Sequence, residues 1–345
     1  MAGGLRGVKR RFDVTLCGYY GFGNLGDELI ARGLVHLLIR NGIPADRIAV
    51  LSASGNIEDS EKTVLVPRWD PVKVLNTLAQ SRTLLLGGGG LFQDSTSVRS
   101  CVYYWGIVRM AVLAGCIPWA FGQSIGPLKS SAASFFARDA LSLCRVRCVR
   151  DEGSLDWLKA HGMEGEIAPD AVLALSDRLD LSGGDRDHLL VNIRPWHGSL
   201  PTATAAAARI LGERTGLPLM GVALSDEDLE LMNKLREDGL FSPVSTVRVR
   251  TVEDVVKTWR SGAEAFGMRL HFCVISAVAG MPCMAVPYDP KVSGFASWWG
   301  LPLWDGDGPL PAIEIHPDTK QKVKESMAIL EESFAKMLWT VLGGE

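Results

Sequence analysis

The sequence lacks the features that mark several classes of protein. No second Cys or His pair follows Cys144 and Cys148, although these two have helical spacing, so the pattern of a zinc site is incomplete. The seven cysteines are odd in number and lie mostly inside apolar segments, and we expect free, buried thiols in a reducing compartment. A basic excess is also missing, because 36 Lys and Arg stand against 39 Asp and Glu, for a formal net charge of −3. This balance argues against a nucleic-acid-binding protein.

A long uninterrupted apolar run is missing as well. The longest one, residues 105–121, is broken by Arg109, Gly115 and Pro118, which argues against a transmembrane helix. No long apolar region follows the basic start MAGGLRGVKRR, so we expect neither a signal peptide nor a membrane anchor, and we expect a cytoplasmic protein. The basic residues of this start are Arg6, Lys9, Arg10 and Arg11. They can touch anionic lipid at the inner face of the membrane, but we favour a solvated tail.

The pattern that is present is an alternation of strands and helices. A chain of 345 residues suggests two domains, and this alternation predicts an α/β fold with doubly wound parallel sheets. The polar, Gly-rich stretch 175–187 is the expected linker between an N-terminal domain at 12–176 and a C-terminal domain at 187–320. A final amphipathic helix is expected at 321–342, where it can pack across both domains. We expect strands at 12–17, 48–51, 83–86, 118–121, 146–149, 188–193, 217–222, 244–249, 263–266 and 283–287.

Residues 263–292 contain the clearest group of candidate functional residues. The stretch has the pattern of a strand, a buried helix and a second strand, with Arg269 and His271 where the helix begins and Lys291 beyond the second strand. Ligands bind at the carboxyl ends of strands in open α/β sheets, and a helix N-terminus favours anions. Two permanent cations and one titratable imidazole therefore predict a site for a small anion with proton transfer. A single His in an apolar stretch is often a core residue, but the neighbouring Arg269 favours a functional His271.

The glycine motif GFGNLG at 21–26 follows a strand and opens a helix, as a dinucleotide-binding loop does. The acidic residue that would bind a ribose hydroxyl is missing from the end of the second strand, which has the sequence LSAS at 51–54. This absence disfavours a nicotinamide cofactor. Asn24 and Asp27 are either helix caps or ligand contacts, and the sequence does not decide between them.

Two further glycine-rich segments, GGGGLFQD at 87–94 and GQSIGP at 122–127, are expected to be loops at strand ends. Asp94 and Arg99 can hold a sugar, or they are a helix cap and a solvated Arg; we favour ligand contact because of their place at a strand's carboxyl end. Gln123 can both donate and accept hydrogen bonds.

Two arginines recur at strand ends, Arg150 and Arg194, and a guanidinium offers a fixed fork to carboxylate or phosphate. Asp170 follows another expected strand. It either orients a base or an acceptor hydroxyl, or it caps the next helix.

Six motifs in this order resemble the polysaccharide pyruvyl transferase family, and most closely its CsaB type. They are GYYGFGNLGDE (18–28), LGGGGLFQDSTSVRS (86–100), GQSIGP (122–127), VRDEGS (149–154), NIRPW (192–196) and GMRLH…YDPKV (267–292). The resemblance implies a GT-B-like fold, in which two Rossmann-like domains place the site in the cleft between them. It also implies transfer of a pyruvyl group from phosphoenolpyruvate to a sugar, N-acetylmannosamine of a lipid-linked cell-wall polymer, as a 4,6-ketal.

The resemblance also assigns roles by motif. It implies that Arg150, Arg194 and Lys291 bind the donor, with His271 close to the reacting carbon. We add Arg269 to the donor side and Asp170 to the catalytic residues, and expect no metal and no cofactor besides the co-substrate phosphoenolpyruvate. The acceptor-binding candidates are the polar residues near the glycine motifs: Asn24, Asp27, Asp94, Arg99 and Gln123.

Two other interpretations stay open. A nucleotide-sugar glycosyltransferase or epimerase shares the two-domain architecture, and binding of a uridine nucleotide in place of phosphoenolpyruvate would favour it. The second is a non-catalytic sugar- or nucleotide-binding module, which would bind ligand without releasing phosphate. Function therefore has to be argued from the site and not from the fold.

Overall fold

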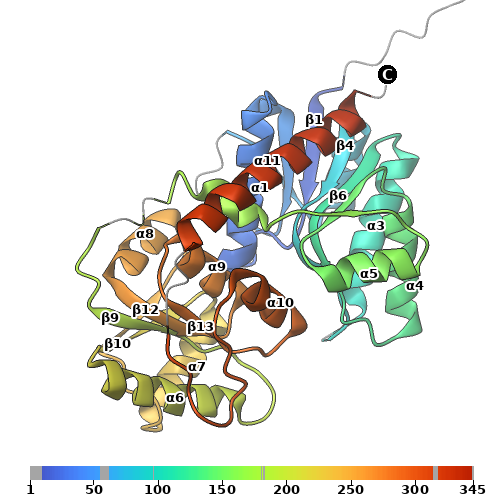
Figure 1. The fold of residues 1–345 in the computed structure, drawn as a ribbon. Helices are drawn as coiled ribbons and strands as arrows, with labels where there is room; N and C mark the ends of the chain where they lie inside the picture. Colours follow the sequence, from blue (N-terminus) through green and yellow to red (C-terminus); the bar gives the residue numbers. More distant parts are fainter. Residues whose placement is uncertain are drawn as a thin grey trace, which may run out of the picture. The chain divides into compact units, whose positions relative to one another are not determined.

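Two parallel β-sheets organise the chain, and each is flanked by helices (Figure 1). The computed structural model describes residues 10–54, 62–95, 97–179, 181, 183–313 and 318–343. Arg6 and Lys9 of the basic start lie outside these residues, as does part of the expected linker. By contacts the chain divides into a first unit (1–22, 34–168 and 332–345) and a second unit (23–33 and 169–331). The expected domain limits of 12–176 and 187–320, and the cleft between the domains, stay predictions.

The first unit contains a sheet with strand order β3-β2-β1-β4-β6-β7-β8, in which β5 pairs with β6 and all pairs are parallel. The order reverses between β1 and β4, the point at which open α/β sheets commonly bind ligands. The strands are β1 (Phe12–Cys17), β2 (Ile48–Ser52), β3 (Val64–Pro67), β4 (Ser81–Leu86), β5 (Gly89–Phe92), β6 (Ile117–Ile125), β7 (Arg147–Val149) and β8 (Glu166–Ile167).

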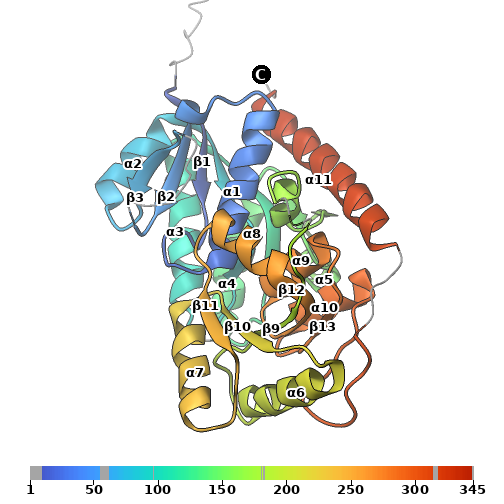
Figure 2. The same ribbon diagram turned by 90° about the vertical axis from the view of Figure 1, so that its left-hand side faces the viewer.

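Helices cover this sheet because its strands bury side chains on both faces. Leu84 and Leu86 of β4 belong to one core with the apolar sides of α2, α3 and α4, and Figure 2 shows α2 beside the β3–β2–β1 edge. On the other face Phe334 packs on Trp119 and Phe121, with ring centroids 5.6 and 4.9 Å away. The helices are α1 (Leu25–Arg40), η1 (Ala45–Arg47), α2 (Pro71–Ala79), α3 (Arg99–Leu113), α4 (Ser131–Ser142), α5 (Glu152–Ala160) and α11 (Thr319–Leu342), of which α1 and α11 contribute residues to both units.

The second unit contains a five-stranded parallel sheet with order β11-β10-β9-β12-β13. This order reverses between β9 and β12. The strands are β9 (His188–Asn192), β10 (Leu219–Ala223), β11 (Ser245–Arg248), β12 (Gly262–Gly267) and β13 (Cys283–Ala285). The helices α6 (Leu200–Thr215) and α7 (Asp226–Glu237) cover one face, and α8 (Val252–Ser261) and α9 (Leu270–Val278) the other (Figure 1). Two further elements are η2 (Ala171–Leu175) and α10 (Pro290–Trp299).

The prediction of an α/β fold with parallel Rossmann-like sheets is confirmed. The two glycine-rich segments were wrongly expected to be loops throughout: Gly89 and Gly90 lie in β5, and β6 runs on to Ile125. The pairing register of β6 shifts between Ala120 and Gln123, and Gly122 there has φ of +72°. A glycine bulge of this kind lets a strand continue where the sequence suggests a turn. The expected strands also did not include β3 and β5.

All seven cysteines are free and buried, as the sequence predicts. Burial raises the pKa of Cys17 to about 12, and Arg68 nearby only partly offsets it, so this thiol is protonated at neutral pH. None of the described helices has the length and hydropathy needed to cross a membrane.

Candidate active site

The carboxyl edge of the second sheet gathers three of the four predicted donor-binding cations. Arg194 follows β9 and Arg269 follows β12, the two strands at which the order reverses, and Lys291 follows β13. Asp228 lies in the first turn of α7, just after β10. The loops after neighbouring parallel strands meet at one edge, so the topology alone brings these side chains into one region.

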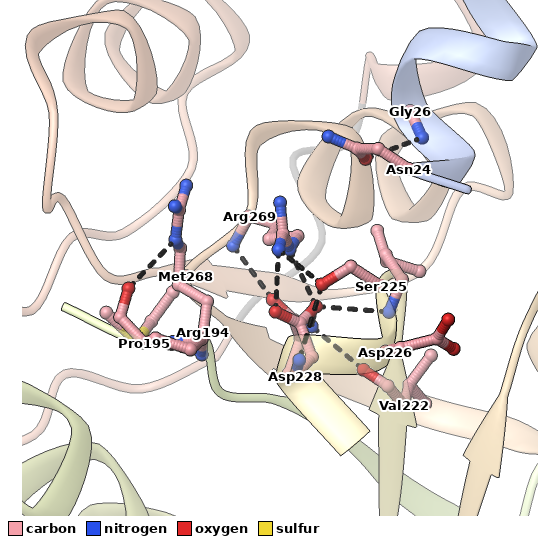
Figure 3. Close-up of polar contacts among 12 residues, drawn as sticks. Asn24, Gly26, Arg194, Pro195, Val222, Ser225, Asp226, Asp228, Met268 and Arg269 are labelled. Carbon is pink, nitrogen blue, oxygen red and sulfur yellow. Dashed lines mark hydrogen bonds and ion pairs between the residues drawn. The ribbon is translucent and has the colours of Figure 1, made fainter. Parts of the chain in front are cut away.

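Arg269 forms a buried ion pair with Asp228 (Figure 3). Its Nε donates to Oδ2 of Asp228 at 2.6 Å, its Nη2 donates to Oδ1 at 2.7 Å, and Nη2 also donates to the Ser225 hydroxyl at 2.7 Å. Asp228 is fully buried and Arg269 is 8% exposed. Burial acts to lower the pKa of the Arg269 guanidinium, but the Asp228 charge and hydrogen bonds outweigh it and the pKa lies above its usual value. The charge of Arg269 is therefore already matched inside the protein.

The same network fixes the start of α9. The backbone N–H of Arg269 donates to Oδ1 of Asn192 at 2.9 Å, and Nδ2 of Asn192 donates to the carbonyl of Val222 at 2.8 Å. Arg269 is the residue before the helix, which begins at Leu270 as the sequence predicts. Three strands thereby hold the turn that carries His271.

Arg194 and Lys291 both lie close to one aromatic residue, Tyr288. Nη1 of Arg194 donates to the Tyr288 hydroxyl at 2.8 Å, and its Cζ lies 4.5 Å from the Tyr288 ring centroid. Nζ of Lys291 lies 5.9 Å from the same centroid and 3.7 Å from Oδ2 of Asp289, which caps α10. Within the described part of the chain no carboxylate pairs with Arg194. Its guanidinium is held in place by a ring and a hydroxyl while its charge stays available to an anion.

His271 lies in the first turn of α9 and faces Asp170. Its Nε2 is 3.5 Å from Oδ2 of Asp170, and the two side chains are only 13% and 7% exposed. Among the described residues this nitrogen has no hydrogen-bond partner. Asp170 also accepts a hydrogen bond from the N–H of Val172 at 2.9 Å, so it caps η2 as well as facing His271. Both interpretations of Asp170 from the sequence are therefore compatible with its position.

Gly26 packs directly against the His271 ring. A Cβ at Gly26 would lie 2.0 Å from Nδ1 of His271, so no larger residue fits without moving the imidazole. The backbone N–H of Leu25 donates to the carbonyl of Leu224 at 3.0 Å, and Nη2 of Arg248 donates to the carbonyl of Gly23 at 2.5 Å. These two hydrogen bonds hold the start of α1 in the second unit, where Gly26 of the glycine motif contacts the His271 ring.

Asn24 caps α1, because its Oδ1 accepts from the N–H of Gly26 at 3.2 Å (Figure 3). Asp27 lies close enough to Arg269 for its charge to contribute to the raised pKa of that guanidinium. Their acceptor-binding roles stay predictions.

The remaining predicted residues lie in the first unit. Gln123 is fully buried, and its Nε2 donates to the carbonyls of Leu86 and Gly87, which fixes the start of the glycine segment after β4. Nε of Arg150 donates to the Ser124 hydroxyl at 2.7 Å, and that hydroxyl donates to the carboxylate capping α5. Gln123 and Arg150 are therefore neighbours at the carboxyl ends of β6 and β7.

Asp94 braces a loop of the first unit. Its carboxylate accepts from the N–H groups of Lys129 at 2.7 Å and Ser130 at 2.8 Å. Burial raises the pKa of Asp94, but the hydrogen bonds from Lys129 and Ser130 outweigh burial and the pKa is lowered. Arg99 is exposed and is the first residue of α3.

The sequence interpretation missed the residues that hold the candidate site together. Asp228 looks like an ordinary acid in the first turn of a helix, three residues after the cap Ser225. Asn192 and Tyr288 belong to the motifs NIRPW and GMRLH…YDPKV, but only the cations of these segments were predicted to bind the donor. The signal available was their place: each lies at or just beyond the end of a strand in the second sheet.

The sequence model of the polysaccharide pyruvyl transferase family matches residues 24–290, well over half of the chain. The chain belongs to this family. The matched segment includes every predicted site residue except Lys291. The enzyme is therefore a polysaccharide pyruvyl transferase by family, and no curated protein matches its sequence.

Solved structures extend the comparison to the fold. The UDP-GlcNAc 2-epimerase from Methanocaldococcus jannaschii has a TM-score of 0.60 at 9% identity, over 96% of this chain and 100% of that one. The S. aureus MnaA–UDP co-structure has a TM-score of 0.59 at 10% identity, over 96% and 97%. A glycosyltransferase from Rickettsia africae ESF-5 has a TM-score of 0.56 at 8% identity, over 97% and 100%. At such identities these likenesses show the fold alone, and they confirm the expected GT-B-like class of the pyruvyl transferase.

Proposed function

We propose that this pyruvyl transferase, of the CsaB type, transfers the pyruvyl group of phosphoenolpyruvate to N-acetylmannosamine in a cell-wall polysaccharide precursor. The product is a cyclic 4,6-ketal, and phosphate is released. Family membership supports pyruvyl transfer to a polysaccharide. The observation that carries the choice of donor is the pair of cations near Tyr288, namely Arg194 and Lys291, which follow strands of the same sheet edge as His271.

The donor carries a carboxylate and a phosphate on a three-carbon frame. Arg194 offers a planar fork that suits either group, and Lys291 offers a point charge. In the proposal Arg150 adds a third cation from the first unit. Arg269 serves the donor indirectly, since its own charge is matched by Asp228 and its role is to position α9.

The proposed reaction begins with proton transfer to the methylene carbon C3, which leaves a positively charged carbon at C2. A sugar hydroxyl attacks C2, and the C2–O bond to phosphate breaks with both electrons leaving on the phosphate oxygen. The second hydroxyl then closes the ketal at C2. Of the two hydroxyl protons lost, one balances the proton gained by C3 and the other leaves with phosphate.

His271 is the proposed acid–base residue in these proton transfers. General acid–base catalysis by a positioned imidazole contributes roughly 10²–10⁴-fold to rate. Asp170, 3.5 Å from Nε2, stabilises the protonated ring, and the pressing backbone of Gly26 sets its orientation. The polar residues proposed to hold the acceptor are Asn24, Asp27, Asp94, Arg99 and Gln123. A lipid-linked acceptor would bring the cytoplasmic enzyme to the inner face of the membrane.

The direct test is incubation with phosphoenolpyruvate and methyl N-acetylmannosaminide. We expect one pyruvyl group to add to the sugar by mass, with one phosphate released per product. His271→Ala should lower phosphate release by at least about 100-fold, the lower limit for an acid–base group. His161→Ala, at the end of α5, serves as the control and should stay near wild type.

Near-wild-type turnover by His271→Ala would contradict the role of this residue. Uridine nucleotide binding that excludes phosphoenolpyruvate would favour a nucleotide-sugar enzyme instead. Donor binding without phosphate release, across a panel of N-acetylated sugars, would favour a binding module.

A further inference from the structure

Four aromatic side chains of the first unit form a continuous, partly exposed surface, here called the aromatic platform: Tyr19, Phe22, Trp69 and Tyr103. Tyr19 and Phe22 are stacked, with ring centroids 4.1 Å apart and planes 11° apart. Phe22 meets Trp69 edge-on, with centroids 6.3 Å apart and planes 77° apart, and Trp69 is tilted against Tyr103, at 5.4 Å and 59°. Trp69 is 64% exposed, Tyr19 44% and Phe22 38%. A cluster of exposed rings indicates a binding surface, whereas single exposed apolar side chains are ordinary on a protein surface.

The platform lies at the carboxyl edge of the first sheet. Tyr19 and Phe22 belong to the loop after β1, and Trp69 comes two residues after β3. Tyr103 reaches the platform from α3. Two of the contributing segments thus follow the carboxyl ends of strands, and one of them is the loop at the reversal of strand order.

A buried arginine holds the platform rigid from beneath. Arg68 is 4% exposed, and its Cζ lies 4.4 Å from the Tyr103 ring centroid, 5.0 Å from that of Phe22 and 5.2 Å from that of Trp69. Its Nη1 donates to the carbonyl of Gly18 at 2.7 Å, which ties the same guanidinium to the loop after β1. No carboxylate of the described residues pairs with Arg68. Ring faces and a carbonyl carry this buried charge, so the rings are fixed before any ligand arrives.

We propose that the aromatic platform stacks a pyranose ring of the carbohydrate acceptor; this rests on the proposed function. One face of a pyranose presents C–H groups with partial positive charge, and aromatic faces carry partial negative charge. Stacking buries that face while the sugar hydroxyls stay in water. A polysaccharide acceptor has rings beyond the one that reacts, and the exposed ring of Trp69 offers a face on which one of them can stack.

The test replaces Trp69 by Ala and by Leu. The probe is a four-ring oligosaccharide that carries N-acetylmannosamine at its non-reducing end. We expect each variant to raise the KM for this acceptor about fivefold to tenfold, the size of one lost aromatic contact, with the KM for phosphoenolpyruvate unchanged. Leu keeps an apolar side chain but no flat ring, so it separates stacking from general apolar contact. Trp339→Ala is the matched control, since Trp339 is 52% exposed on α11.

Calorimetric titration with the same oligosaccharide makes the result independent of turnover. Loss of affinity in both Trp69 variants supports the platform even if the wild type transfers no pyruvate, in which case only the proposed reaction fails. Unchanged acceptor KM and affinity would overturn the platform. So would an equal rise in donor KM, or a loss of binding to anionic lipid vesicles in Trp69→Ala with oligosaccharide affinity unchanged.

Discussion

The carboxyl edges of the two sheets share a topology and differ in chemistry. Both sheets reverse their strand order in the middle, between β1 and β4 in the first and between β9 and β12 in the second. The first edge carries glycines, aromatic rings and one donor candidate, Arg150, whereas the second carries Arg194, Lys291 and His271. Flat rings suit a neutral sugar, and fixed cations suit a small anion. In the proposed function the aromatic rings of the first edge therefore serve the acceptor, and most of the donor-binding cations lie at the second edge.

The two edges also bury an arginine in different ways. Arg68 at the first edge has ring faces and a carbonyl for partners, whereas Arg269 at the second edge has a carboxylate. The carboxylate fixes a charge network across three strand ends, and the rings create a surface. Removing one partner at each edge should therefore break different properties of the enzyme.

The largest effect should come from Asp228→Ala. It leaves the Arg269 guanidinium buried without its counter-charge, which typically costs 3–5 kcal/mol, so we expect a fall of about 4 kcal/mol in the free energy of unfolding. Urea denaturation measures it. Glu230→Ala, an exposed acid two residues further along α7, should change stability by less than about 0.5 kcal/mol.

The double variant Asp228→Leu with Arg269→Met sharpens the test, because it removes both charges together. It should recover much of the stability lost in the single variant. A single variant as stable as wild type would mean that water, and not Asp228, matches the charge of Arg269.

The next effect concerns Gly26→Ala, which should disable the second edge without touching a charge. The new Cβ would lie 2.0 Å from Nδ1 of His271, so the imidazole has to move. A displacement of about 1 Å at a catalytic group costs on the order of 100-fold, and we expect that fall in kcat. Gly106→Ala is the matched control, since Gly106 also lies in a helix but a Cβ there meets nothing within 4 Å. If both variants keep full kcat, the glycine motif does not orient His271.

The sequence was sufficient for most of the strands, though not for β3 and β5, and for the cations at strand ends. Period and glycine position predict where a strand stops, and the residues just after parallel strands then meet at one edge of the sheet. The sequence was not sufficient for the interaction partners of these cations. Nothing local in DEDLE at 226–230 indicates that Asp228 pairs with Arg269, forty-one positions away. It also did not reveal the aromatic platform, because Phe22 and Trp69 become neighbours only when β1, β2 and β3 pair. The glycine bulge in β6 was not predicted for a third reason. A glycine with positive φ has the same sequence signal in a turn and in a bulged strand.

The smallest of these effects, and the one that addresses the donor most directly, concerns Arg194→Ala. Arg194 has no carboxylate partner among the described residues, so its loss leaves no buried charge behind and stability should stay near wild type. Losing a hydrogen bond to a charged donor group costs about 1.5–3 kcal/mol, so the KM for phosphoenolpyruvate should rise roughly tenfold or more. The KM for the sugar should not change, and Arg209→Ala, an exposed arginine on α6, should change neither. A rise in the sugar KM alone would place the acceptor at the second edge and reverse the assignment of the two edges.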